Sequence, residues 1–176
     1  LVHTRKRTAV SLILESGEIR NVHQTACVLG FGVRAVNPYL AHECIEELIS
    51  LGLLDKDLHT AIYDYDRALL GGVVKIAAKM GISTIGSYRG AGLFEIIGLE
   101  RDIVDLCFPG TPSRIGGASW EALQQEVEAQ VRASADQTTP LPPGGLLKFV
   151  HGGEYHAYNP DVVNSLQKAV HSGEYS

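Results

Sequence analysis

Apolar residues along this chain alternate between short continuous runs and runs in which they recur every three or four positions. The continuous runs at residues 9–14 (AVSLIL) and 33–36 predict two short buried strands of the kind found in parallel sheets. Helical spacing follows each run, from residue 21 to Gly30 or Gly32 and over residues 37–52. Two successive strand–loop–helix units repeat in parallel α/β sheets and barrels, so the sequence predicts an α/β fold with a partial β/α barrel-like arrangement.

Two Asn-Pro pairs mark expected helix starts. Asparagine accepts hydrogen bonds from free N–H groups at a helix start, and proline fits the first turn because its missing N–H has no partner there. Asn37 is therefore expected to cap the second helix, with Pro38 in its first turn. Asn159 and Pro160 are expected to open a C-terminal helix that ends at Gly173.

A long helix is predicted over residues 61–80, followed by Gly81 in the left-handed conformation that ends many helices. This helix contains the pair Gly71-Gly72, which costs about 2 kcal/mol relative to two alanines. The pair indicates either the close approach of a neighbouring backbone or a bend.

The stretch after that helix is predicted to form a strand over residues 82–85, a polar turn over residues 86–90 and a helix from about Ala91 to Ile97. Loops at the carboxyl ends of strands often carry ligands in α/β folds. A tight connection within the core is the alternative interpretation.

The rest of the chain is richer in turns. Residues 103–108 (IVDLCF) are apolar enough for either a strand or the buried end of a helix, and residues 109–117 predict a loop. An amphipathic helix is predicted over residues 120–132. Residues 133–145 hold three of the seven prolines and predict a Pro/Gly-rich linker or strap, and residues 151–160 predict an extended segment.

Composition limits the classes of partner. The 176 residues carry a formal charge of −5, and their basic residues cluster only at Arg5–Arg7, so neither a nucleic-acid surface nor a nucleic-acid partner is expected. No apolar run approaches the length of a membrane span, and no signal peptide is recognisable. The widely spaced Cys27, Cys44 and Cys107 favour free thiols over disulfides or a zinc site, so a cytoplasmic location is expected.

Several titratable residues are candidates for chemistry. Glu15, Glu18 and His23 lie on and just after a loop at a strand's carboxyl end, where they would serve either acid–base catalysis or the capping of the next helix. Capping is the preferred interpretation. His42 is expected to be an exposed helical residue, because only Glu46 or Glu47 stands at the spacing of a second metal ligand.

Two small-residue turns are candidates for anion binding. Ser87–Gly92 contains a Gly-x-Gly and Arg89, and Ser113–Gly117 contains Arg114. Small residues at a helix N-terminus can cradle a phosphate, with arginine adding charge. A lone Gly-x-Gly is a weak signal, and either turn would equally serve to pack one domain on another.

The chain resembles the large subunit of glutamate synthase along nearly its whole length. The matching blocks follow that family's order: ESGE with Arg20 and His23, GFG, AVNPYLA, KMGISTIGSYRGA, SRIGGAS and GEYHAYNPDVVNSLQKAV. The resemblance implies an enzyme that makes L-glutamate from L-glutamine and 2-oxoglutarate. In that family a glutaminase domain releases ammonia, which travels inside the protein to an FMN domain with a 3Fe-4S cluster for reductive amination, with electrons from a small NADPH-oxidising subunit or ferredoxin.

The resemblance also implies what this chain contributes. Residues 1–108 are similar to the end of the central domain, and residues 109–176 to the linker, strap and helices that lead into the FMN-binding domain. The family's nucleophilic N-terminal cysteine belongs to a glutaminase domain far upstream of the region that this chain resembles, and residue 1 here is Leu1. The three cysteines also lack the spacing of the ligands that hold the iron–sulfur cluster. We therefore expect a fragment that acts as scaffold between the glutaminase and FMN domains, inactive alone and binding neither cofactor.

No catalytic, cofactor-binding or metal-binding residue follows from the resemblance. Thr84, Ser87 and Arg89 are expected to make polar contacts at the domain junction or to an anion. The alternative hypothesis is a free-standing α/β module that binds a phosphorylated ligand or flavin at Ser87–Gly92.

Overall fold

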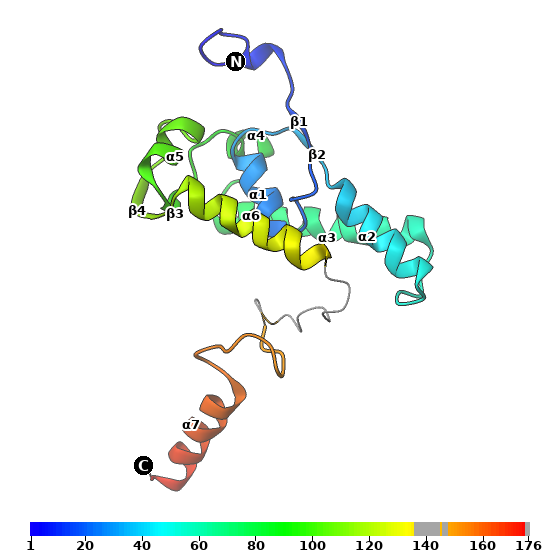
Figure 1. Ribbon diagram of the computed structural model, residues 1–176, viewed down its shortest axis with the longest axis vertical. Coiled ribbons are helices and arrows are strands. Elements are labelled where there is room, and N and C mark those ends of the chain that lie inside the picture. The colour runs from blue at the N-terminus through cyan, green and yellow to red at the C-terminus, as the bar shows by residue number, and fades with distance from the viewer. Residues whose placement is uncertain (136–144, 146–147, 175–176) are drawn as a thin grey trace. The chain divides into compact units, whose positions relative to one another are not determined.

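The computed structural model describes residues 1–135, 145 and 148–174, which belong to two compact units, Leu1–Ser119 and Trp120–Ser176 (Figure 1). The first unit contains, in chain order, η1 (Arg7–Ala9), β1 (Ile13–Glu15), α1 (Val22–Gly30), β2 (Ala35–Asn37), α2 (Tyr39–Ser50), α3 (Leu58–Lys79), α4 (Ile85–Tyr88), β3 (Ile96–Leu99), α5 (Arg101–Cys107) and β4 (Ser113–Ala118). The second contains α6 (Trp120–Ala135) and α7 (Pro160–Ser172).

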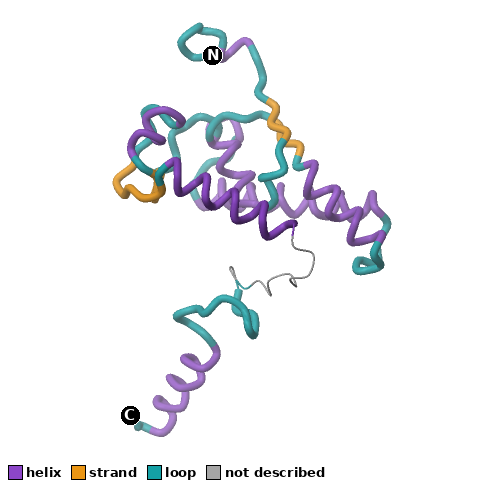
Figure 2. Tube along the Cα trace, viewed as in Figure 1, coloured by secondary structure: helices purple, strands orange, loops and turns teal. Residues whose placement is uncertain are grey.

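The strands form two separate parallel pairs, as Figure 2 shows in orange. β1 pairs with β2 in the register Ile13 to Ala35 and Glu15 to Asn37. β3 pairs with β4, with α5 contacting both strands. The predicted α/β class with parallel strands is confirmed, and the described residues form no closed barrel.

The core of the first unit lies where α1 packs on α3, and α2 also contacts α3. Ala26 of α1 is buried, as are Ala61, Leu69 and Val73 of α3. The close approach of these helices explains why residue 72, the second of the pair Gly71-Gly72, is a glycine. A Cβ atom on Gly72 would lie only 2.4 Å from the methyl groups of Val22.

The predicted helix start near Asn21 is confirmed, the predicted cap at Asn37 is not, and α3 begins at Leu58 rather than at residue 61. Asn21 caps α1 through a capping box with Gln24, and the Asp57 carboxylate accepts from the Thr60 N–H at 3.0 Å to cap α3. The prediction that Asn37 caps α2 is wrong. Asn37 ends β2 opposite Glu15, and its side-chain amide donates to the Glu15 carboxylate at 2.8 Å instead.

The prediction for residues 82–97 is also wrong. Ile85 begins the short helix α4 rather than ending a strand, and the strand β3 starts at Ile96, inside the predicted helix. Two contacts hold this segment on α1: the Tyr88 hydroxyl donates to the Ala26 carbonyl at 2.9 Å, and the Gly90 N–H donates to the Gly30 carbonyl at 2.8 Å. Tyr88 is fully buried as a result.

Glycines with positive φ explain why the helix predicted from about Ala91 to Ile97 does not form. The φ values of Gly90, Gly92 and Gly98 are +67°, +65° and +86°, in the left-handed region that right-handed helices exclude. Gly81 is left-handed as predicted, with φ +72°, and it ends α3.

The remaining segments settle the open alternatives. Residues 103–108 lie mostly in helix α5, and the predicted loop at 109–117 contains strand β4. At Gly117 a Cβ atom would lie 2.4 Å from the Gly98 carbonyl oxygen, which accounts for the small residues there. The helix predicted over residues 120–132 extends as α6 to Ala135, and most of the predicted strap lies outside the described residues.

α7 begins as predicted. The Asn159 side chain accepts from the N–H groups of Asp161 and Val162 at 3.0 and 3.1 Å, Pro160 lies in the first turn, and Gly173 ends the helix with φ +73°. Asn159 itself is buried, and its side-chain amide donates to the His156 carbonyl at 3.0 Å.

Candidate functional site

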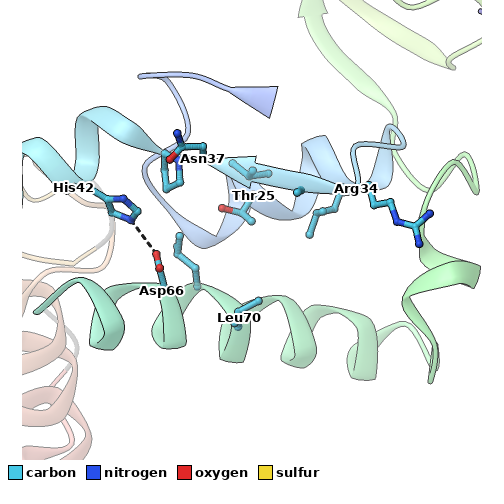
Figure 3. A pocket seen from close by; sticks show the side chains of 11 residues that line it. Thr25, Arg34, Asn37, His42, Asp66 and Leu70 are labelled. Atoms are coloured by element: carbon cyan, nitrogen blue, oxygen red, sulfur yellow. Dashed lines mark hydrogen bonds and ion pairs between the residues drawn. The ribbon is translucent and has the colours of Figure 1, made fainter. Parts of the chain in front are cut away.

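A pocket of about 460 Å³ lies between α1, β2, α2 and α3 in the first unit (Figure 3). Its apolar wall is formed largely by α3, α1 and β2, and its polar side chains come from four different elements or their flanks. The polar lining residues are Thr25, Arg34, Asn37, His42 and Asp66.

One polar contact between two residues of this pocket joins α2 to α3. His42 Nε2 lies 3.0 Å from Asp66 Oδ1, and the imidazole makes an edge-to-face contact with the Tyr65 ring at 5.7 Å between centroids. The prediction that His42 is an exposed helical residue is wrong, because its side chain is only 25% exposed. Burial and the Asp66 charge raise the pKa of Tyr65, whose hydroxyl donates to the Arg20 carbonyl at 3.0 Å.

Two other polar side chains of the pocket are engaged within the fold. The Thr25 hydroxyl donates to the Asn21 carbonyl at 2.9 Å, and Asn37 donates to Glu15. No side chain of the described lining is placed as a nucleophile beside His42. The His42–Asp66 pair is therefore best explained as a polar link between two helices.

The predicted acid–base group does not assemble. Glu15 accepts from Asn37, Glu18 pairs with Arg20 at 3.4 Å, and His23 lies 3.6 Å from the Cys27 sulfur. The preferred interpretation of these residues as helix caps is wrong as well, since Asn21 and Gln24 cap α1.

Thr84 and Ser87 are brought together at the start of α4, where their hydroxyl oxygens lie 3.0 Å apart. Arg89 lies in a different hollow of about 260 Å³, whose lining also includes Arg7 and Arg34. Sequence reasoning singled out Arg89 but missed the other two. No short motif joins arginines from three separate segments, so only the fold reveals the group.

Comparison with known proteins identifies the family. The sequence profile of the glutamate synthase central domain matches residues 1–100. The chain belongs to the glutamate synthase family. It is 40% identical over 178 residues to the glutamate synthase (NADPH) large chain of Bacillus subtilis (strain 168), a match that covers 100% of the chain and 12% of that relative.

Other glutamate synthases also match almost the whole of this chain and a small part of their own length. The glutamate synthase (NADH) of Saccharomyces cerevisiae is 39% identical over 184 residues, covering 97% of the chain and 9% of the relative. The ferredoxin-dependent glutamate synthase of Cyanidium caldarium is 38% identical over 188 residues, covering 100% and 12%. The chain thus spans about a tenth of the length of these relatives.

Among the described residues, neither the three cysteines nor the turn at Gly90 and Gly92 forms a site for the iron–sulfur cluster or the FMN that the resemblance implies. Cys27, Cys44 and Cys107 are free thiols, and the described residues contain no group of three or more His, Cys, Asp or Glu side chains that would hold a metal. Burial raises the pKa of the Cys27 thiol and disfavours its thiolate. The hollow beside Gly90 and Gly92 measures about 240 Å³, below the roughly 300–1,000 Å³ usual for cofactor-sized ligands.

No helix in the described part of this glutamate synthase segment has the length and apolar character needed to cross a membrane.

Proposed function

We propose that this chain is a structural segment of a glutamate synthase large polypeptide that forms L-glutamate from L-glutamine and 2-oxoglutarate, by reductive amination with channelled ammonia. The observation that carries the proposal is 36–40% identity along 97–100% of the chain to glutamate synthases about ten times its length. The segment acts as scaffold between the glutaminase and FMN domains. In this proposal the central-domain part ends at residue 108, and the segment that leads into the FMN-binding domain begins at residue 109.

Exposed apolar helix faces support the scaffold role. Val162, Val163, Leu166 and Val170 follow helical spacing along α7, and Leu166 and Val170 are each 64% exposed. Isolated exposed apolar residues are common, but a face of four along one helix marks a packing surface. A segment that packs between larger domains accounts for such a face.

FMN and the 3Fe-4S cluster belong, in this proposal, to other parts of the polypeptide. The electron donor is either a small NADPH-oxidising subunit or ferredoxin. Relatives named for NADPH, NADH and ferredoxin all match this chain with 36–40% identity, which supports the view that the donor is selected outside it. The three free thiols support a cytoplasmic location.

The first test is the intact mass of the native polypeptide. A mass far above 19.0 kDa is expected, and a mass near 19.0 kDa would overturn the proposal. The isolated chain should bind no flavin and form no glutamate.

The scaffold role has its own test in the full polypeptide. Leu166→Gln places an amide on the apolar face of α7, and Lys168→Gln is the control on the same helix. We expect Leu166→Gln to release ammonia to bulk solvent and lower glutamate formation per glutamine hydrolysed, while Lys168→Gln leaves this ratio unchanged. Equal coupling ratios in both variants and the unmodified enzyme would refute the scaffold role.

A further inference from the structure

Three arginines from separate segments line one hollow of the first unit. Arg7 lies in η1, Arg34 lies just before β2, and Arg89 follows α4. Ser11 and Gly86 lie in the same lining, and no carboxylate is among the described residues that form it. Three basic residues therefore line about 260 Å³, with no acidic residue in the described part of its wall.

Backbone hydrogen bonds hold the Arg7 guanidinium and the chain at Arg34 in place. The Arg7 guanidinium donates to the Gly32 carbonyl at 2.5 Å and more weakly to the Val10 carbonyl at 3.5 Å. The backbone N–H of Arg34 donates to the Leu12 carbonyl at 2.8 Å, which fixes this segment beside the residues that lead into β1. Arg34 also lines the pocket described above, but in Figure 3 its side chain points away from His42 and Asp66.

Arg89 supplies the observation that points to a ligand. Its Nε atom is buried and has no hydrogen-bond partner within the described part of the chain. A buried donor of a charged group that lacks an acceptor destabilises the fold, so such groups are usually satisfied. None of the three arginines forms an ion pair among residues 1–135, 145 and 148–174, although other arginines of the chain do.

We propose that the hollow lined by Arg7, Arg34 and Arg89 binds a phosphate group, either inorganic phosphate or a small phosphate monoester. Guanidinium groups match phosphate oxygens in charge and geometry, and a dianion relieves the repulsion among three neighbouring cations. The volume admits a phosphate with a few further atoms and is too small for most larger ligands. This site is independent of the scaffold role.

The test uses the full polypeptide that contains this chain. Inorganic phosphate and glycerol 3-phosphate are titrated separately by calorimetry, with succinate as a dicarboxylate comparison. We expect saturable binding of at least one phosphate probe and none of succinate. Tighter binding of glycerol 3-phosphate would identify a monoester as the ligand, and equal or weaker binding would identify free phosphate.

Substitutions locate the site. Arg34→Gln and Arg89→Gln should each weaken phosphate binding by about tenfold or more, because each removes a charge-assisted hydrogen bond. Arg101→Gln is the matched control, since Arg101 pairs with Asp105 on the surface of α5 at 3.1 Å. Arg89→Lys should bind better than Arg89→Gln, and far-UV circular dichroism checks that each variant is folded.

Several results would overturn the proposal. These are the absence of phosphate binding, binding of succinate with the same arginine dependence, or equal affinity in Arg34→Gln, Arg89→Gln and Arg101→Gln. If a carboxylate from another part of the polypeptide fills the hollow, phosphate will not bind, and the proposal is overturned.

Discussion

The contact between α1 and α3 gives a sharp test of packing, because two adjacent glycines of α3 differ in their surroundings. A Cβ atom on Gly72 would lie 2.4 Å from both Val22 methyl carbons, whereas one on Gly71 would meet nothing within 4 Å. Both positions are inside the helix, so alanine gains about 1 kcal/mol of helix propensity at either one. The propensity gain therefore cancels when the two variants are compared.

The remaining difference is the cost of overpacking. Forcing a methyl group into a packed interface costs about 1–3 kcal/mol, and the β-branched Val22 has few other rotamers in α1. We expect Gly71→Ala to stabilise the chain by up to about 1 kcal/mol. Gly72→Ala should be about 1–3 kcal/mol less stable than Gly71→Ala.

Urea unfolding followed by far-UV circular dichroism measures this difference. In thermal unfolding the same difference corresponds to about 2–4 °C for each kcal/mol. Adding Val22→Ala to each variant tests the cause, because it should lower the cost of Gly72→Ala selectively. If Gly72→Ala matches Gly71→Ala in stability, the helices do not approach as closely as described.

Three further predictions concern single side chains. Tyr88→Phe should lower the free energy of unfolding by about 1–3 kcal/mol, because the Ala26 carbonyl loses a buried donor; unchanged thermal stability would contradict this. Asn159→Ala should destabilise α7 by about 1 kcal/mol, seen as faster amide exchange in its first turns and refuted by unaltered exchange. Cys27 should react with iodoacetamide more slowly than the exposed Cys44 and Cys107, because only the thiolate reacts and burial raises the pKa of the Cys27 thiol. The reaction rate of Cys27 should therefore rise only at higher pH. Equal rates and equal pH profiles for the three cysteines would exclude this effect.

The two Asn-Pro pairs show how far local pattern predicts this fold. The same dipeptide caps α7 at Asn159 but leaves α2 without a side-chain cap at Asn37. The difference arises from the partner strand, because Asn37 pairs in register with Glu15 and donates to its carboxylate. Nothing within a few residues of Asn37 signals that acceptor, which lies in an earlier strand.

The errors at residues 82–97 have a similar origin. Leu93, Phe94, Ile96 and Ile97 have helical spacing, but Phe94 contacts the rings of Tyr88 and Phe31 while Ile96 and Ile97 enter a strand. Contacts across the chain therefore override a short periodic run. The parallel α/β class was predictable because two separate strand–loop–helix units carry the pattern.

The arginine hollow was not predictable for a related reason. Sequence motifs report ligands that come from neighbouring positions, whereas Arg7, Arg34 and Arg89 lie far apart in the sequence and line one hollow only in the folded unit. Of the three, only Arg89 lies among small residues in the sequence, which is why a motif points to it. Its predicted contacts at a domain junction or to an anion stay a prediction until the variants are measured.

The two strand pairs carry a consequence for handling this chain. Each pair has only two strands in the described part of the chain, so every strand keeps one side whose N–H and C=O groups have no neighbouring strand. Such edges are templates for association with other chains, and isolated two-stranded pairs are marginal in water. β1 and β2 span only three residues each and offer short edges, whereas β4 spans six and leaves Ile115 exposed. Intermolecular pairing should therefore begin at β4 when the chain is prepared alone.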